Sequence, residues 1–598
     1  MTIKNSFQIF TATVLAIGLQ SCGDFLDKLP DDRTEIDSVD KVQQLLKTAY
    51  PQVNFAWLCE LSSDNLLDNQ TPHLPSSPSK KQVVTYYNYA SYERWDDELF
   101  HFDLASMATY SDTDAPGSLW AGYYSSIASC NYALQTLDEL QAKGETVNDR
   151  FRALRAEAKI LRAYSHFCLV NIFSQAYSTD ADNAQNVGVP YVTEPETTMM
   201  KHYERGTVAE TYRMIKQDLE EALPDISDSY MGSVKYHFNT QAAHAFAARF
   251  YLYTRDWNKV IEHANEVLGT DSASVERVMM DWSGFDDAVY MDDYAKIWQG
   301  PDQASNLMLI SSYSLLMRHG YGNRYSMAGE KCQDVLLYSS NGLSKGIYGN
   351  PQLFVGAYLF GSSTHDYGYY PSKVGEEFEY TDKLAGIGYC HIIQRAFTTA
   401  SLLLERAEAE LMLGQVKNCS DDICLYWNSA YNHFSDKNKE EFKNYVLHLD
   451  DATILKKYTQ TSEMTVDGNG LPMEKRKVSN RNCYTTDEWN TFAGNVDNLY
   501  GVNDLTMPYM NCLNEMRRFE NCYEGHRFFD LKRWGMTWEH KQGSEGEVIR
   551  MEGKDVRRAI DVPWEAMASG LESSRPTQAA PQTRSLVIDR VTRIPDGE

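Results

Sequence analysis

The sequence predicts a mainly α-helical protein, in which pairs of helices pack against a loop-rich half with few short strands. Two observations lead to this class. Apolar residues recur at helical spacing over several long stretches, and these stretches come in pairs separated by short breaks. The segments between the pairs have little periodicity, but they are rich in tyrosine, tryptophan and small polar residues.

The first predicted helix pair occupies residues 151–223. Phe151, Leu154 and Leu161 recur on one face of its first helix, which makes that helix amphipathic. A second amphipathic stretch follows a loop and ends at Pro224, because proline cannot continue a helix. We therefore expect two antiparallel helices here.

Two further pairs are predicted over residues 239–269 and 395–435. In the first of these, alanines allow close packing of the two helices, and Gly269 is suited to close the second one. In the other, Gly414 separates the two helical stretches. Pairs of this kind resemble tetratricopeptide units embedded at irregular spacing. The alternative for any single pair is a chance amphipathic hairpin.

Three long segments, residues 62–118, 275–390 and 455–505, lack clear periodicity. Loops of this length are usually functional or disordered, and their aromatic content argues against disorder. The last segment, residues 569–598, has the opposite composition and is predicted to be a flexible tail.

The N-terminus has the pattern of an export signal. Lys4 precedes an apolar run over residues 7–19, which is shorter than the ~20 residues of a membrane span. The run ends at Ser21-Cys22, which resembles the lipobox of bacterial lipoproteins, although Gln20 departs from it. This resemblance implies that Cys22 becomes the acylated first residue of the mature chain. The alternative is a secreted protein with a chance cysteine.

Composition excludes several classes of function. A formal net charge of -27 argues against a nucleic-acid partner, which would require a basic surface. The 11 cysteines show no zinc spacing, and no pattern of a metalloprotease, serine hydrolase, phosphate-binding loop or EF-hand is present. We therefore predict no cofactor and no metal.

The acidic loop GFDDAVYMDDY keeps two alternatives open. Its four aspartates, Asp286, Asp287, Asp292 and Asp293, could supply the two carboxylates of an all-α glycosidase, or could hold a calcium ion. Acidic loops in a protein of this charge are ordinarily solvated, and we predict that the protein is not an enzyme.

Residues 511–536 form the densest cluster of charges and aromatic rings in the chain. We interpret the stretch as a helix, a break at Gly525 and a second helix, joined by charged hydrogen bonds that orient Arg527 and Asp530. Acid/base chemistry by Glu524 and His526 is the alternative, which we rank well below the structural one.

This cluster resembles the C-terminal signature of the SusD/RagB family of outer-membrane lipoproteins of Bacteroidota. The matching positions are Arg517, Arg518, Glu520, Glu524, Gly525, His526, Arg527, Asp530, Leu531, Arg533, Trp534 and Gly535. Met516, Phe519 and Asn521 depart from it. LSSDNLLDN, LWAGYYSSIASCNYAL, RAEAKILRAYSHFCLVNIF and AARFYLYTRDWNKVIEHANEVL resemble further family segments in the same order.

The resemblance implies a SusD-like fold over residues 22–568, after a lipoprotein signal peptide at residues 1–21. It also implies a lipid-anchored protein on the outer face of the outer membrane, acting as a lid on a SusC-like TonB-dependent transporter. Such a protein captures oligosaccharides for import, or in some members peptides. A scaffold that works only through its helix pairs would leave the aromatic loops unexplained.

Ligand contacts are predicted in two of the long loops. The first offers Trp95 with Asn88 and Arg94 as polar partners, and the resemblance places part of the family's ligand site near it. A second group of candidates follows in the next long loop, namely Trp282, Trp298 and Tyr321. Tryptophan rings suit the apolar face of a sugar, but for many rings in such loops the alternative is simple packing. The ligand itself cannot be named from the sequence.

Overall fold

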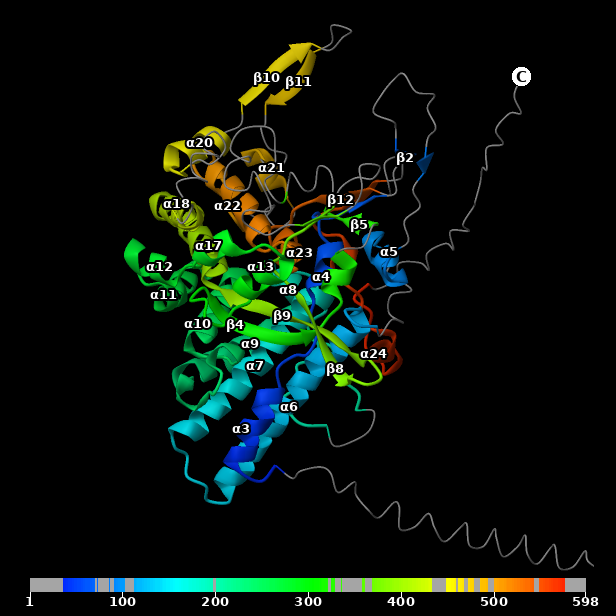
Figure 1. The fold of residues 1–598 in the computed structure, drawn as a ribbon, viewed down its shortest axis with the longest axis vertical. Coiled ribbons are helices and arrows are strands. Elements are labelled where there is room, and N and C mark those ends of the chain that lie inside the picture. The colour runs from blue at the N-terminus through cyan, green and yellow to red at the C-terminus, as the bar shows by residue number, and fades with distance from the viewer. Residues whose placement is uncertain are drawn as a thin grey trace, which may run out of the picture.

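The computed structural model describes residues 36–69, 72–73, 85–86, 91–102, 112–196, 201–320, 324–327, 335, 358–360, 368–432, 448–458, 461–466, 472–477, 484–492, 499–541 and 548–575. The structure confirms the helical class, with antiparallel helix pairs along most of the described chain (Figure 1). The predicted signal peptide, including Cys22, lies outside these residues. Within them, no helix combines the length and the apolar character that crossing a bilayer requires.

Helices are present at each of the three predicted pairs. The long helices are α6 (Pro116–Ala142), α7 (Asp149–Phe173), α9 (Val208–Ala222), α10 (Thr240–Thr254), α11 (Trp257–Leu268), α17 (Thr399–Met412), α18 (Val416–Asn432) and α22 (Met507–Glu520). Helix α7 packs between α6 and α9, α10 packs on α11, and α17 packs on α18. Helix α17 also contacts α10, α11 and α22, so that successive pairs stack on one another.

The shorter helices connect and cover these pairs. They are α3 (Val39–Thr48), α4 (Ala56–Leu61), α5 (Arg94–Phe100), α8 (Asp180–Gln185), α12 (Ser272–Val278), α13 (Met291–Trp298), α14 (Leu316–Gly320), α20 (Asp451–Tyr458), α21 (Thr486–Thr491), α23 (His526–Arg533) and α24 (Trp564–Ala568).

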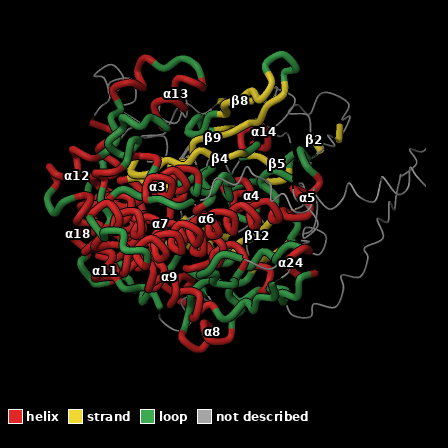
Figure 2. Tube along the Cα trace, turned by 90° about the horizontal axis from the view of Figure 1, so that it is seen from below, coloured by secondary structure: helices red, strands yellow, loops and turns green. Residues whose placement is uncertain are grey.

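The largest sheet described has three antiparallel strands in the order β4-β9-β8. These strands are β4 (Asn306–Tyr313), β8 (Glu376–Asp382) and β9 (Ile387–Thr398). In Figure 2 the sheet runs along one side of the helices. Residues 275–390 show no clear periodicity in the sequence, because β4 is an almost continuous apolar run whose pairing with β9 is non-local.

The remaining strands form two-stranded pieces. They pair as β1 (Leu67–Asp68) with β5 (Tyr325–Ser326), β2 (Pro72–His73) with β3 (Thr85–Tyr86), β6 (Tyr358–Phe360) with β7 (Gly368–Tyr370), β10 (Thr461–Val466) with β11 (Pro472–Lys477), and β12 (Trp538–Lys541) with β13 (Val548–Met551).

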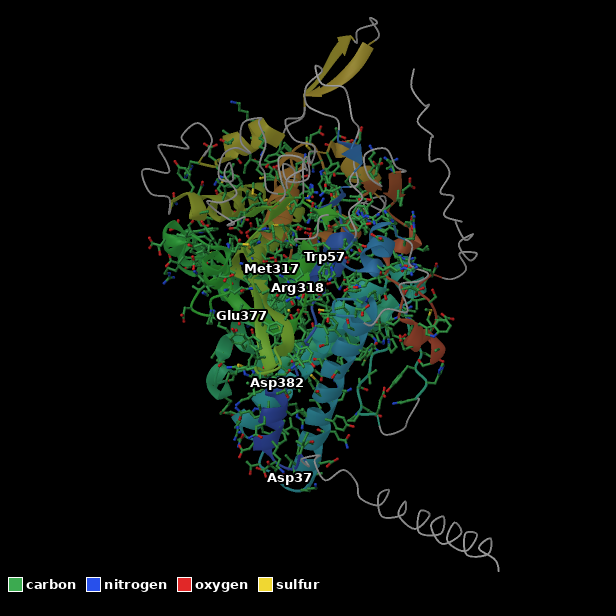
Figure 3. All side chains as sticks on the ribbon, turned by 45° about the vertical axis from the view of Figure 1, so that its right-hand side comes forward. Asp37, Trp57, Met317, Arg318, Glu377 and Asp382 are labelled. Atoms are coloured by element: carbon green, nitrogen blue, oxygen red, sulfur yellow. The ribbon has the colours of Figure 1, made fainter. Side chains whose placement is uncertain are left out.

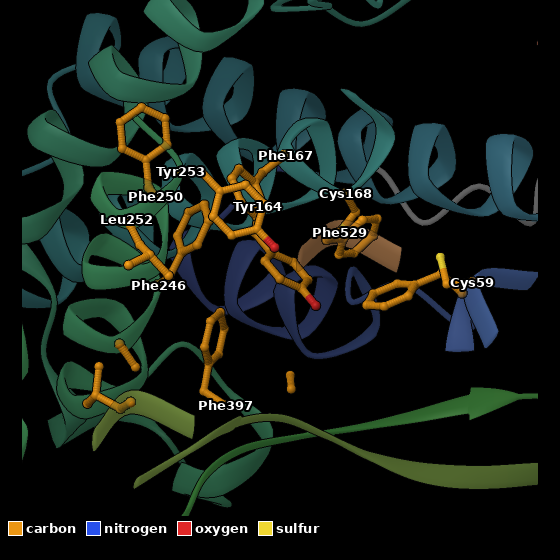
Figure 4. Packing of buried hydrophobic residues seen from close by; sticks show 14 of the residues in the cluster. Cys59, Tyr164, Phe167, Cys168, Phe246, Phe250, Leu252, Tyr253, Phe397 and Phe529 are labelled. Carbon is orange, nitrogen blue, oxygen red and sulfur yellow. The ribbon is translucent and has the colours of Figure 1, made fainter. Parts of the chain in front are cut away.

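The core joins the helix pairs to the sheet through aromatic rings. Figure 4 shows Tyr164 and Phe167 of α7 facing Phe246 of α10 and Phe397 of β9. The ring centroids of Tyr164 and Phe246 are 5.6 Å apart, and those of Phe246 and Phe397 are 6.1 Å apart. Edge-to-face contacts at such distances add to the burial of apolar area, so these rings fix the sheet against the helices.

The C-terminal signature forms the predicted helix, break and helix. Helix α22 is followed by Gly525, whose φ of 81° lies in the left-handed region, and α23 begins at the next residue. Asp530 accepts hydrogen bonds from the buried guanidinium groups of both Arg517 and Arg533. Arg527 donates to both carboxylate oxygens of Asp64, at 2.7 and 2.9 Å. The structural interpretation is therefore confirmed.

The predicted tail begins later than residue 569. Ser574 donates a hydrogen bond to the carbonyl of Phe173 at 2.7 Å, and its backbone N–H donates to Asp561. Arg575 donates to the carbonyl of Ala559 at 2.9 Å. Residues 569–575 thus belong to the folded body, and residues 576–598 lie outside the described part.

Candidate ligand-binding surface

Two of the aromatic loops meet where α5 lies against α14. Asp96 of α5 accepts hydrogen bonds from Trp57 Nε1 at 2.8 Å and lies 3.2 Å from His319 Nδ1 of α14. Trp57 stacks on the His319 ring at 5.1 Å. Segments that are more than two hundred residues apart in sequence are therefore joined by one buried carboxylate.

Rings surround His319 on several sides. The Trp95 ring lies 5.4 Å from it, and the edge of Tyr92 lies 4.8 Å from it. Tyr92 remains 43% exposed, whereas Trp95 is 0% exposed. Tyr92 is therefore the ring of this cluster that a ligand in solution can reach.

An arginine continues the surface from α14 to strand β8. Arg318 donates to both oxygens of Glu376, each at 2.9 Å. The pKa of Arg318 is raised, mainly by the Glu376 carboxylate and also by a hydrogen bond with Tyr92. Figure 3 shows Met317 and Arg318 beside Trp57, with Glu377 and Asp382 further along the hairpin of β8 and β9.

The hairpin adds two exposed aromatic rings to the same face. Phe378 and Tyr380 are both exposed, and their rings lie 4.8 Å apart. They share a face with Glu376 because side chains alternate along a strand. We call Tyr92, Arg318, Glu376, Phe378 and Tyr380 the α5–β8 surface.

Two carboxyls, one of them buried, hold α5 and α14 in position beneath this surface. Asp114 accepts hydrogen bonds from the backbone N–H of Leu315 at 2.7 Å and from Ser314. Burial raises the pKa of Asp114 to about 6. On the other side of α5, Asp97 accepts a hydrogen bond from Tyr325 at 2.7 Å. These contacts make the surface a fixed part of the fold.

The predicted contact residues fall in different places. Arg94 is exposed at the start of α5, beside the α5–β8 surface, and pairs with Glu98 at 3.3 Å. Asn88 and Tyr321 lie outside the described residues. Trp95 is corrected from a contact residue to a packing residue, because Trp95 and Leu99 form the buried face of α5.

The other two tryptophans lie apart from α5. Trp282 and Trp298 pack edge to face at 5.4 Å, and α13 is well separated from α5 in Figures 1 and 2. Trp298 is 2% exposed and stacks under the Arg395 guanidinium at 4.6 Å. The hollow beside them measures about 20 Å³, which is room for one water and not for a sugar ring. Trp298 is therefore also a packing residue, while Trp282 is partly exposed.

The acidic loop does not assemble a pair of buried carboxylates. Asp293 caps the first turn of α13 and accepts hydrogen bonds from the backbone N–H groups of Tyr290 and Val289, which lower its pKa. Asp287 is exposed, and Asp292 is not buried. Across the described ranges, no group of three or more acidic, histidine or cysteine side chains is arranged to hold a metal ion.

Sequence reasoning missed a second aromatic hollow along α6. Trp120, Tyr124 and Tyr132 recur at helical spacing on this helix and line a cavity of about 450 Å³ together with Tyr203. Glu194, Glu196 and Lys201 also line it. The signal was the spacing of the three rings, which places them on one helical face. Sequence reasoning also missed His319, Asp96, Arg318 and Glu376, because their partners are distant in sequence.

Comparison with known proteins identifies the fold and one matching family model. Residues 24–252 match the SusD-like family model described as "Starch-binding associating with outer membrane". No curated protein matches the chain.

Solved structures cover nearly the whole chain. A SusD superfamily protein from Bacteroides thetaiotaomicron aligns with a TM-score of 0.56 at 14% identity, covering 90% of this chain and 100% of that one. A putative sugar binding protein from Bacteroides vulgatus aligns with a TM-score of 0.55 at 18% identity, covering 90% and 99%. At such identities the likeness establishes the fold alone.

Proposed function

We propose that the chain is a member of the SusD/RagB family, and that it is a binding protein that captures oligosaccharides at the α5–β8 surface. The observation that carries the proposal is the grouping of exposed rings around one charged pair. Tyr92 contacts Arg318, which is held by Glu376, and Phe378 and Tyr380 follow Glu376 on the same face of β8. A sugar presents an apolar face of C–H groups and a rim of hydroxyls, and this surface offers partners for both.

The family description and a sugar-binding neighbour support a glycan ligand over a peptide. Tyrosine and arginine also bind peptides, so a peptide ligand remains the second candidate for the same surface. An enzymatic function has weaker support, because Asp293 caps a helix and Asp287 and Asp292 are solvated.

We further propose that Cys22 is acylated and anchors the protein to the outer membrane, facing the outside of the cell. The support is the cysteine at the end of a short apolar run, together with the family's description as associating with the outer membrane. In this arrangement the protein delivers its ligand to a SusC-like TonB-dependent transporter. No metal or cofactor is required for this role.

The test is binding by purified protein that lacks residues 1–22. Affinity electrophoresis against starch, laminarin, xylan and pectin identifies a glycan, and calorimetry with a tryptic digest of casein tests the peptide alternative. If no polysaccharide retains the protein and the digest releases heat on binding, the ligand is a peptide and not a glycan.

The surface is tested with two matched tyrosine variants. Tyr92→Ala is expected to raise Kd between about 5-fold and 100-fold, since stacking on an aromatic ring contributes ~1–3 kcal/mol by analogy with nucleic-acid bases. Tyr132 is the control, because it is 45% exposed and lies on α6. A loss confined to Tyr132→Ala would move the site to the α6 hollow.

A further inference from the structure

A small pocket between α7, α8 and α23 is lined by an unusual number of cations. Its volume is about 210 Å³, many times the ~10–15 Å³ that one water needs in this measure. The charged side chains that line it are Lys532, Arg533, Lys554, Arg558 and Asp182. The lining therefore carries four cations and one carboxylate, whereas the whole chain has a formal net charge of -27.

Lys532 is a buried ammonium that donates hydrogen bonds to backbone carbonyls. Its Nζ donates to the carbonyls of Asn171 and Ser174, at 2.5 and 2.8 Å, at the C-terminal end of α7. No carboxylate lies within ion-pair distance of it among the described residues. A helix C-terminus carries a charge of about −0.5, which offsets part of one positive charge.

Arg558 is a second buried cation that lines this pocket. It is 1% exposed, and its terminal nitrogens donate to the carbonyls of Gly553, Leu531 and Met536 at 2.5–2.7 Å. Its Nε is buried and has no acceptor in the described part of the chain. A buried donor without an acceptor is costly, and an acceptor atom supplied by a ligand would remove that cost.

The two cations repel each other, and the Asp555 carboxylate, which raises the pKa of Arg558, offsets only part of the effect of burial. Burial, and then repulsion from Arg558, lower the pKa of Lys532 to about 7. Burial lowers the pKa of Arg558 to about 9. Arg533 does not add to this excess, because Glu408 and Asp530 balance its charge.

The mouth of the pocket carries a third cation. Lys554 is exposed and lies 3.4 Å from Asp182 on α8. The amide side chains of Gln175 and Asn186 also line the pocket and can donate hydrogen bonds. An anionic group in this pocket would meet buried cations, amide donors and an exposed lysine at the opening.

We propose that this pocket binds an oxyanion group, a sulfate or a carboxylate, with Lys532 and Arg558 as the buried charges and Lys554 at the entrance. The group belongs either to a free anion or to an acidic sugar. The pocket is lined by none of the residues of the α5–β8 surface, and its occupancy does not depend on glycan capture there.

The experiment titrates the full folded protein by calorimetry with sodium sulfate and with sodium glucuronate, against sodium chloride at the same ionic strength. Glucose is the neutral control. We expect saturable binding of at least one anion and none of glucose. Binding of sulfate alone indicates a sulfate group, and binding of glucuronate indicates a carboxylated sugar.

Two charge-reversal variants separate a site from a general salt effect. Lys554→Glu places a negative charge at the entrance and is expected to raise Kd about fivefold or more. Lys417→Glu is the matched control, because Lys417 is also exposed, pairs with Asp421 and lies on α18. Lys532→Met is expected to abolish binding while the protein still unfolds cooperatively.

The proposal is overturned if neither anion binds saturably, or if Lys554→Glu and Lys417→Glu change Kd by the same factor. Equal binding of glucose would also overturn it, because charge would then not be what the pocket recognises. If Lys532→Met does not fold, the proposal is tested by the comparison of Lys554→Glu with Lys417→Glu.

Discussion

The Arg517 guanidinium contacts both carboxylate oxygens of Asp530, each at 3.0 Å, across the Gly525 break between α22 and α23. Arg533 contacts the same carboxylate at 2.7 Å, and all three side chains are buried. These cations, together with hydrogen bonds to them, hold the pKa of Asp530 well below its ordinary value against the opposing effect of burial. The two helices are therefore joined by a fully desolvated ionic cluster.

Replacing Asp530 with alanine should lower the free energy of unfolding by about 3–5 kcal/mol, because two arginines would lose their shared buried carboxylate. Urea unfolding followed by circular dichroism measures this change. Asp421→Ala, which breaks an exposed pair with Lys417, should leave the midpoint in place. An unchanged midpoint with lost ligand binding would move the cluster from the scaffold to the site.

The sequence predicted this cluster and the helix pairs because both depend on local pattern. The period of apolar residues in α7 or α11 and the glycine at residue 525 are properties of short segments. The sheet was not predicted, since β4 pairs with a strand more than seventy residues away. Trp95 and Tyr92 illustrate the limit for the site: tertiary packing around His319 decides which ring faces solvent.

His166 should make the protein less stable in mild acid. Its Nδ1 donates to the Arg162 carbonyl at 2.9 Å, and its Nε2 accepts from Val192 N–H at 3.1 Å, so the ring is neutral and fully buried. Burial lowers its pKa to about 3 from 6.5. Because the folded pKa is depressed, stability is complete above pH 6.5 and is lost as pH falls from 6.5 toward 3.

At pH 5 this histidine alone should cost about 2 kcal/mol, at 1.36 kcal/mol for each unit of pH below 6.5. Urea midpoints at pH 7.5 and 5 measure the loss in the parent and in His166→Gln. The stability of the variant should fall less between pH 7.5 and pH 5 than that of the parent. Contributions of other titrating groups are the same in both proteins and cancel in the comparison. Equal losses in both proteins would contradict the prediction.

Gly525 should tolerate alanine less well than another glycine in a similar backbone conformation. A Cβ at residue 525 would lie 2.9 Å from both Ala56 Cα and Phe55 Cδ2, whereas at Gly414 it would meet nothing within 4 Å. Both glycines have positive φ, so each substitution costs ~1–2 kcal/mol for the backbone. Gly525→Ala adds ~1–3 kcal/mol of overpacking, and thermal unfolding of the two variants should show that difference.

Acylation at Cys22 is tested by labelling cells with radioactive palmitate. Cys22→Ala should abolish the label, because no other cysteine stands at the end of the apolar run. Cys390→Ala is the control, since Cys390 is a partly buried cysteine of strand β9 and should leave labelling intact. Label that persists in Cys22→Ala would remove the lipid anchor from the proposal.

Trp95 should contribute to stability and only indirectly to binding. Its ring packs in the core beside His319 and Leu99, so Trp95→Ala should cost about 3–5 kcal/mol through the cavity it leaves. Trp95→Phe retains an aromatic ring in that space and should bind the ligand with the Kd of the parent. Tyr92 precedes α5 and is partly exposed, so it contributes little to the core. Tyr92→Ala should therefore leave the melting temperature nearly unchanged and weaken binding. Calorimetric binding and thermal unfolding of both variants separate the two roles. A Trp95→Phe protein that melts like the parent but binds much more weakly would show that this ring does reach the ligand.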